Sequence, residues 1–176
     1  MPNIDIDLNP VDFITIGTIG PKGQRVFHLQ AAKGDRLITL IIEKEQAGAL
    51  SEALRELIDD LDQRVPAPSG RSPMTNMELR DPVEPLFRVA QMGLGYDEEH
   101  DLVVLIAQEL VPLGDEEDEE DQEDQEALDE SENKPGVVRM WCSRAQMRAL
   151  SEHSSQTVRQ GRPDPKQNGR LIYYWT

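Results

Sequence analysis

The sequence predicts an α+β fold built from duplicated βββα units, with antiparallel sheet structure and one packed helix per copy around a pseudo-two-fold axis. Two observations support this prediction. The word Ala-Leu-Ser-Glu occurs twice in similar surroundings, in residues 46–52 (QAGALSE) and 146–152 (QMRALSE). Both copies lie in segments with helical periodicity, and each segment follows three runs that have the character of strands. At 176 residues the chain is long enough for one compact domain.

The first half, residues 1–64, is expected to contain three strands and one helix. Two turns, at residues 20–23 and 33–35, separate the strands through their Gly, Pro and Asp residues. In the helix, apolar residues recur at helical spacing and form one wide stripe, which should pack on the sheet. The predicted strands are residues 13–19, 25–32 and 36–43, the helix is 45–63, and the stripe is Ala49, Leu50, Ala53, Leu54, Leu57, Ile58 and Leu61.

A segment rich in Pro, Ser and Gly, residues 65–85, is predicted to be a linker to the second half, residues 86–176. The aromatic run Leu171–Trp175 is expected to add a final strand or a packed tail. The other predicted elements of this half are strands 87–92, 102–109 and 137–142, a polar turn at 93–101, and a helix at 144–160 with Ser143 as its N-cap.

The two copies also predict where an insertion lies. Their helices are offset by 100 positions but their strands by only about 75, and an acidic insert at residues 114–134 accounts for the difference. Thirteen acidic residues and no basic residue lie between Asp115 and Glu132, which leaves −3 of the net charge of −16 for the rest of the chain. Such a segment is expected to be disordered, and it could meet a basic partner.

Composition also limits the class of protein. Nucleic-acid binding is not expected, because phosphate contacts need clustered Lys and Arg. The single cysteine, Cys142, excludes a disulfide framework and a cysteine zinc site. The N-terminus lacks the pattern of a signal peptide, and no apolar run is long enough to span a membrane. We therefore expect a cytoplasmic protein without a membrane partner, a cofactor or a metal.

The first helix serves as a template for reading the second. At an offset of 100, three apolar positions of the first helix become polar in the second: Ala53 matches His153, Leu54 matches Ser154, and Leu57 matches Thr157. The second helix should therefore dock less strongly. One interpretation is a small polar binding site formed by His153, Ser154 and Thr157, with Arg144 nearby. The other is a more exposed helix whose polar groups are hydrogen-bonded or solvated.

No catalytic group emerges from these residues. His153 and Ser154 are adjacent in the sequence, so their side chains diverge by about 100° on a helix. This geometry is poor for a nucleophile and its base.

Several phrases resemble an uncharacterised bacterial family, catalogued as domain of unknown function three thousand and ninety. The resemblance covers nearly the whole chain outside the acidic insert, and it implies no established activity. The phrases that carry it are residues 13–25 (FITIGTIGPKGQR), 26–32 (VFHLQAA), 42–46 (IEKEQ), 87–97 (FRVAQMGLGYD), 107–108 (AQ) and 161–163 (GRP).

One departure from the family pattern lies near the C-terminus. The resemblance implies a small zinc ribbon after Gly-Arg-Pro, but here residues 164–169 contain no cysteine. A zinc site therefore does not carry over, and the end of the chain, with Tyr173, Tyr174 and Trp175, is expected to pack on the fold in its place. Truncation before Leu171 should then destabilise the protein.

Two hypotheses on function follow. The first is a non-enzymatic, soluble binding or adaptor protein that meets an unknown protein partner in the groove between its halves. The alternative is a small-molecule-binding protein or an enzyme of unknown chemistry, with a polar pocket near His153, Thr157 and Arg144. Convergent polar side chains in an enclosed pocket would favour the second, and a flat exposed apolar face the first.

Overall fold

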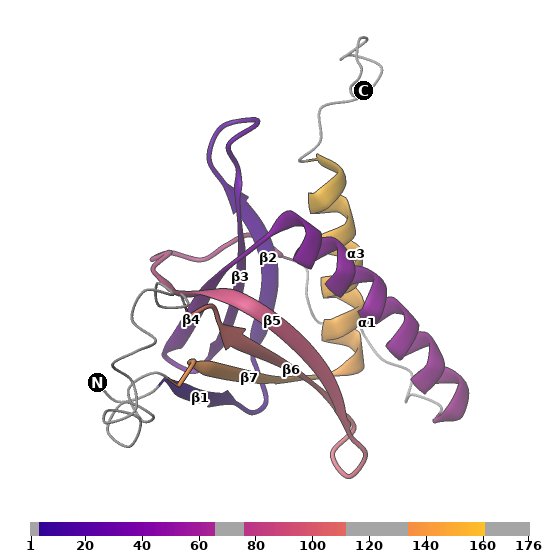
Figure 1. Ribbon diagram of the computed structural model, residues 1–176. Coiled ribbons are helices and arrows are strands. Elements are labelled where there is room, and N and C mark those ends of the chain that lie inside the picture. The colour runs from indigo at the N-terminus through magenta and orange to yellow at the C-terminus, as the bar shows by residue number, and fades with distance from the viewer. Residues whose placement is uncertain (1–3, 66–75, 112–133, 161–176) are drawn as a thin grey trace, which may run out of the picture.

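Two helices and one seven-stranded sheet form a mixed α+β fold in the computed structural model (Figure 1), which describes residues 4–65, 76–111 and 134–160. The predicted α+β class is therefore confirmed. The predicted acidic insert, apart from Lys134, and the aromatic run Leu171–Trp175 lie outside the described residues. The strands are β1 (Asp5–Leu8), β2 (Phe13–Ile19), β3 (Val26–Lys33), β4 (Arg36–Ile42), β5 (Pro85–Asp97), β6 (Leu102–Glu109) and β7 (Val137–Cys142); the helices are α1 (Lys44–Arg64) and α3 (Arg144–Gln160).

The sheet has the strand order β1-β7-β6-β5-β4-β3-β2. Neighbouring strands are antiparallel except for the β1–β7 and β4–β5 pairs, which are parallel. The N–H of Val11, just before β2, donates to the carbonyl of Trp141 in β7 at 2.8 Å. This bond joins regions near opposite ends of the strand order, so the sheet curves back on itself around its core.

A single cluster of buried apolar side chains draws on both halves of the chain. Inward-facing residues alternate along the strands, as a sheet with one face toward a core requires. Ile14, Ile16, Leu29 and Leu40 face this core from the first half, and their registers bring them side by side across β2, β3 and β4. The largest fully buried members of the second half are Leu105, Met140, Met147 and Leu150.

The outer face of β2, β3 and β4 is also covered. Residues 76–84, the described later part of the predicted linker, pass across this face. The amide of Gln30 in β3 donates to the Arg80 carbonyl at 2.9 Å and accepts from the Arg80 N–H at 2.7 Å. A side chain at Gly17 would bring its Cβ to 2.6 Å from Cγ of Leu79, so glycine makes room for this segment. The first three-stranded unit is thus packed on both faces.

Strand β1 was not among the predicted elements. Its signal is the alternation of Ile4, Ile6 and Leu8 with two aspartates, which is typical of a half-buried strand. The run is short, and its partner β7 is more than 120 residues away in the sequence. Only the tertiary fold brings the two strands together.

Strand β5 is longer than predicted, and the turn expected over residues 93–101 is correspondingly shorter. Gly93 and Gly95 suggested a turn, but both lie in β5, opposite Ile106 and Val104 of β6. The alternation of Met92, Leu94 and Tyr96, which pack against the core, continues through them. Glycine in a strand often marks a close approach or a bend rather than its end.

The helices lie together and exchange two equivalent hydrogen bonds. The hydroxyl of Ser51 donates to the Ser151 carbonyl at 2.6 Å, and the hydroxyl of Ser151 donates to the Ser51 carbonyl at 2.6 Å. Figure 1 shows the end of α3 beside the first turns of α1. No helix in the described part of the chain has the length and apolar content needed to cross a bilayer.

Candidate functional site

Of the three polar residues predicted as a site on α3, Ser154 and Thr157 are buried and His153 is half-buried. The hydroxyl of Ser154 donates to the Ala47 carbonyl of α1 at 2.8 Å, and that of Thr157 donates to the His153 carbonyl one turn earlier at 2.8 Å. Burial lowers the pKa of His153, while a hydrogen bond to the Ile16 backbone in β2 acts in the opposite direction. The three predicted residues are therefore close together, and their polar groups have partners within the protein.

Arg144 lies apart from these three residues, at the first position of α3. His153 is nine positions further along α3, which is about 13 Å along the helix axis. Its side chain is 7% exposed and joins distant segments. Nε donates to Asp101 at 2.8 Å, and Nη1 donates to Asp62 at 3.1 Å and to the Val65 carbonyl at 2.6 Å.

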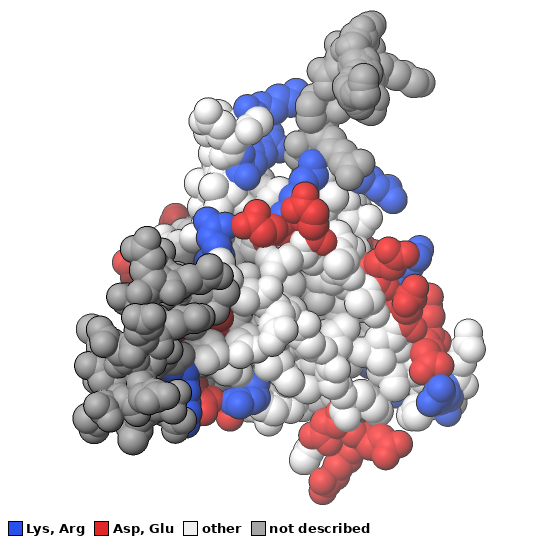
Figure 2. Space-filling model, in the orientation of Figure 1, with Lys and Arg blue, Asp and Glu red and all other residues white. Residues whose placement is uncertain are grey.

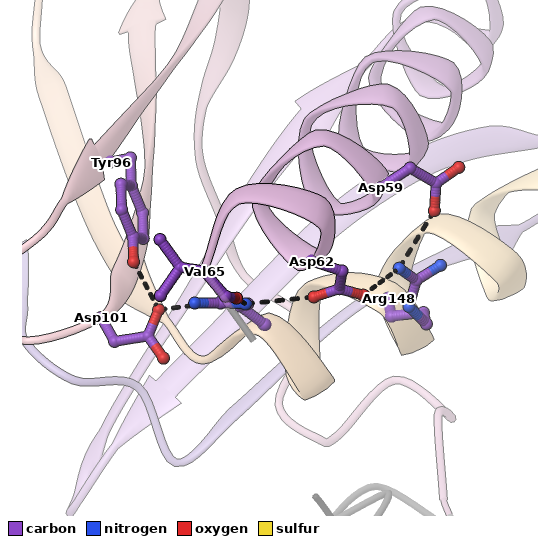
Figure 3. Close-up of polar contacts among 7 residues, drawn as sticks. Asp59, Asp62, Val65, Tyr96, Asp101 and Arg148 are labelled. Carbon is purple, nitrogen blue, oxygen red and sulfur yellow. Dashed lines mark hydrogen bonds and ion pairs between the residues drawn. The ribbon is translucent and has the colours of Figure 1, made fainter. Parts of the chain in front are cut away.

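These contacts belong to a longer chain of polar groups (Figure 3). The Tyr96 hydroxyl donates to Asp101 at 2.7 Å, and Arg148 donates to Asp62 at 2.8 Å and to Asp59 at 3.1 Å. Desolvation acts to lower the pKa of Arg144, but its hydrogen bonds to carboxylates outweigh this effect. They raise the pKa of Arg144 above its usual value. Nη2 is buried and lacks a hydrogen-bond partner among the described residues. The arrangement is an ion-pair network that fixes the end of α1 to the β5–β6 turn.

A first groove, of about 560 Å³, runs between the two helices. This α1–α3 groove contains charges of both signs, and some of them compensate each other. Arg148 pairs with two aspartates of α1, and Arg55 lies 3.8 Å from Glu52. The α1–α3 groove is lined by Gly48, Ser51, Glu52, Arg55, Ile58, Arg148, Ser151, Glu152, Ser155, Gln156, Val158 and Arg159.

A second groove, of about 490 Å³, lies between α1 and β5, and it has no charged residue in its lining. Figure 2 shows a broad uncharged area over β5 and the flank of α1, with an acidic cluster below it. We call this the α1–β5 groove. It is lined by Gln46, Ala49, Leu50, Ala53, Ala90, Gln91, Met92, Gly93, Leu94 and Leu105.

One edge of β5 is open along this groove. β4 pairs with β5 only as far as Arg88 and ends at Ile42, so no described strand lies on this side of residues 89–97. The amide of Gln46 donates to the carbonyls of Val89 at 3.2 Å and Ala90 at 3.3 Å. An unpaired strand edge presents N–H and C=O groups that another strand can bind.

The region between α3 and β2 is closed. The backbone of α3 lies alongside that of β2, whereas α1 and β5 stand further apart in the described structure. Gln146 repeats the contact of Gln46, with its amide donating to the Val11 carbonyl at 3.1 Å. His153 then contacts the Ile16 backbone, whereas its counterpart Ala53 is exposed. The weaker docking expected for the second helix stays a prediction, but its polar side chains find partners within the protein and can therefore be buried.

The groove residues were not predicted as a site from the sequence. Ala49 and Ala53 belong to the apolar stripe that was expected to pack on the sheet, yet both are exposed. Their small size was a signal in the sequence, because alanine side chains do not fill the space between a helix and a strand that lies at a distance from it. The sequence alone gave no distance between α1 and β5. Ser143 does cap α3 as predicted, because its hydroxyl accepts the Gln146 N–H at 3.1 Å.

Comparison with known proteins identifies a family of unknown function. A family model described as "Protein of unknown function (DUF3090)" matches residues 6–169. No curated protein and no solved structure matches the chain. Within the described ranges, no three His, Cys, Asp or Glu side chains gather as a metal site would require.

Proposed function

Because the chain belongs to the DUF3090 family of proteins of unknown function, we propose its function from its own surfaces: a non-enzymatic binding or adaptor protein. In this proposal the α1–β5 groove holds an extended segment of a partner protein, which adds to the open edge of β5. The observation that carries the proposal is the open β5 edge beside an uncharged groove of about 490 Å³. Extended segments often bind by adding a strand to such an edge.

The chemistry of the groove specifies the partner segment. Its lining is apolar apart from two glutamines, so the side chains that point into it should be uncharged and apolar. The turn at the end of β5 carries Asp97, Glu98, Glu99 and Asp101, so a basic residue at that end of the segment is favoured. Backbone hydrogen bonds to the edge would supply affinity, and the pockets between α1 and β5 would supply selectivity.

We propose that the two halves are copies related by a pseudo-two-fold axis. This relation allows the open α1–β5 groove to be compared with the closed contact between α3 and β2. Two matched features support this relation at an offset of 100. Ser51 and Ser151 exchange hydrogen bonds, and Gln46 and Gln146 each accept the backbone N–H three residues earlier while donating to a backbone carbonyl of the other half. On this reading, one copy kept a closed helix–strand contact and the other opened it for binding. We place this activity in the cytoplasm, in line with the single buried cysteine.

A peptide-display selection on the full-length protein tests the binding function. Random seven-residue peptides should yield an alternating apolar consensus with a basic residue at one end. The affinity of the best peptide for the Ala53→Lys variant should be at least about tenfold lower than for the wild type. The same peptide N-methylated at alternate residues should bind about as weakly, because it cannot form the strand hydrogen bonds.

Gln156→Lys is the matched control for that experiment. Gln156 is exposed and lines the α1–α3 groove. Its substitution by lysine adds the same charge as Ala53→Lys, but in the other groove. It should leave peptide binding unchanged. Peptides that bind Ala53→Lys and the wild type equally would overturn the proposal.

A second candidate function is a small-molecule site in the α1–α3 groove. Its larger volume of about 560 Å³ and its arginine and glutamate side chains favour this alternative. It would be supported by a retained small molecule whose binding is lost in Gln156→Lys and kept in Ala53→Lys. A ligand role for Arg144, His153, Ser154 and Thr157 stays a prediction, since the contacts that these residues make in the structure are with the protein itself.

A further inference from the structure

We propose that Leu171–Trp175 of the same chain is the resident occupant of the α1–β5 groove, and that a partner segment must displace it. This inference rests on the proposed function and concerns the regulation of the same site. It follows from the chemistry of the run, from the place where α3 ends, and from the length of chain between them.

The composition of the run fits the groove. Leu171, Ile172, Tyr173, Tyr174 and Trp175 carry no charge, and aromatic and β-branched residues are the types enriched in strands. The run holds two of the chain's three tyrosines and one of its two tryptophans. A segment of this kind gains free energy by burying its side chains and by pairing its backbone with an open strand edge.

The end of α3 lies beside the helix that forms one wall of the groove. Ser154 contacts Ala47 near the start of α1, and the carbonyl of Gln160 accepts a hydrogen bond from Arg25 at 3.4 Å. Figure 1 shows the last turn of α3 next to the first turns of α1. The chain therefore leaves α3 close to the end of α1 that bears Gln46 and Ala49.

The intervening chain is long enough to reach the groove. Ten residues, 161–170, separate Gln160 from Leu171, and they span up to about 33 Å when extended. A helix with its side chains is about 10–12 Å wide. The segment can therefore pass around the N-terminal end of α1 and enter the α1–β5 groove on another side of that helix.

Tryptophan fluorescence of the full chain tests this proposal directly. Trp141→Phe leaves Trp175 as the only tryptophan. In this background we expect blue-shifted emission and protection from acrylamide quenching, and both should be lost when Ala53→Lys is added. Gln156→Lys should leave both unchanged. Exposed emission from the start, or protected emission that Ala53→Lys does not change, would overturn the proposal.

A second measurement links the tail to partner binding. The double substitution Tyr173→Ser and Trp175→Ser, in the otherwise complete chain, should increase the affinity of a display-selected groove peptide about fivefold or more. An unchanged affinity would overturn the role of the tail as a competitor. If the peptide binds the groove but the Trp175 fluorescence does not change in Ala53→Lys, the tail proposal fails and the binding function stands. If Trp175 is displaced by Ala53→Lys but no peptide binds even the tail variant, the binding function fails instead.

Discussion

Arg144 joins three elements that are far apart in the sequence: the end of α1, the β5–β6 turn and the start of α3. Its guanidinium suits this position, because several N–H donors in one plane can meet two carboxylates and a carbonyl together. Desolvation acts to raise the pKa of Asp101, but hydrogen bonds from Tyr96 and Arg144 outweigh it. The net result is a lowered pKa for this carboxyl group. The sequence marked Arg144 as a binding candidate, and its contacts in the fold are those of a structural residue.

Arg144→Ala should lower the free energy of unfolding by about 2–3 kcal/mol. Breaking a buried ion pair costs about 3–5 kcal/mol, and we expect less here because Asp62 and Asp101 are 41% exposed. Chemical denaturation measures the change. Arg148→Ala is the control, since its 39% exposed side chain also pairs with two aspartates and should cost less than about 1 kcal/mol. Equal losses in the two variants would contradict the structural role of Arg144.

At the scale of elements, equivalent positions of the two helices have different roles. His153 contacts the Ile16 backbone of β2, whereas Ala53 lines the open groove between α1 and β5. The contact between the helices themselves is the same from both sides, through Ser51 and Ser151. The helix pair is thus matched at its centre and unequal at its flanks.

Ser51→Ala and Ser151→Ala should destabilise the protein by nearly equal amounts, each about 1 kcal/mol, because each removes one buried hydrogen bond of the same geometry. Thermal or urea unfolding of the two single variants provides the comparison. Ser155→Ala, at a half-buried position in the lining of the α1–α3 groove, serves as a control with little expected effect. Losses that differ by more than about 1 kcal/mol would argue against a pseudo-two-fold relation of the helices.

At the scale of the whole molecule, the net charge of −16 is concentrated in one connection. The ends of β6 and β7 that this connection joins are already in contact, since the Glu109 N–H donates to the Gly136 carbonyl at 2.8 Å. The fold therefore places the two ends together independently of the residues between them. A long acidic connection adds loop-closure entropy and charge repulsion that oppose folding.

Deletion of Asp115–Glu132 should leave the free energy of unfolding unchanged or raise it by up to about 1 kcal/mol. The connection between Glu109 and Val137 would shorten from 27 residues to nine, which is still enough for a hairpin loop. Differential scanning calorimetry at low and high salt separates the loop effect from the charge effect, because salt screens only the second. A large loss of thermal midpoint would show that the deleted segment packs on the fold.

Much of the fold could be predicted from local patterns. Helix α3 begins and ends where the sequence indicated, and α1 differs by one residue at each end. Periodicity and capping are properties of neighbouring residues, so they are legible in the sequence. Strand β1 and the far part of β5 were missed because a short run and two glycines are ambiguous until a partner strand is known.

The sequence by itself determined the α+β class, the periodic faces of the helices and the position of the acidic segment. These properties depend on side-chain type and spacing along a single stretch of chain. The tertiary structure alone decided that α3 closes on β2 while α1 leaves the edge of β5 open, and that Arg144 lies in an ion-pair network. Distances between elements depend on how all the side chains pack at once, and no local pattern contains that information.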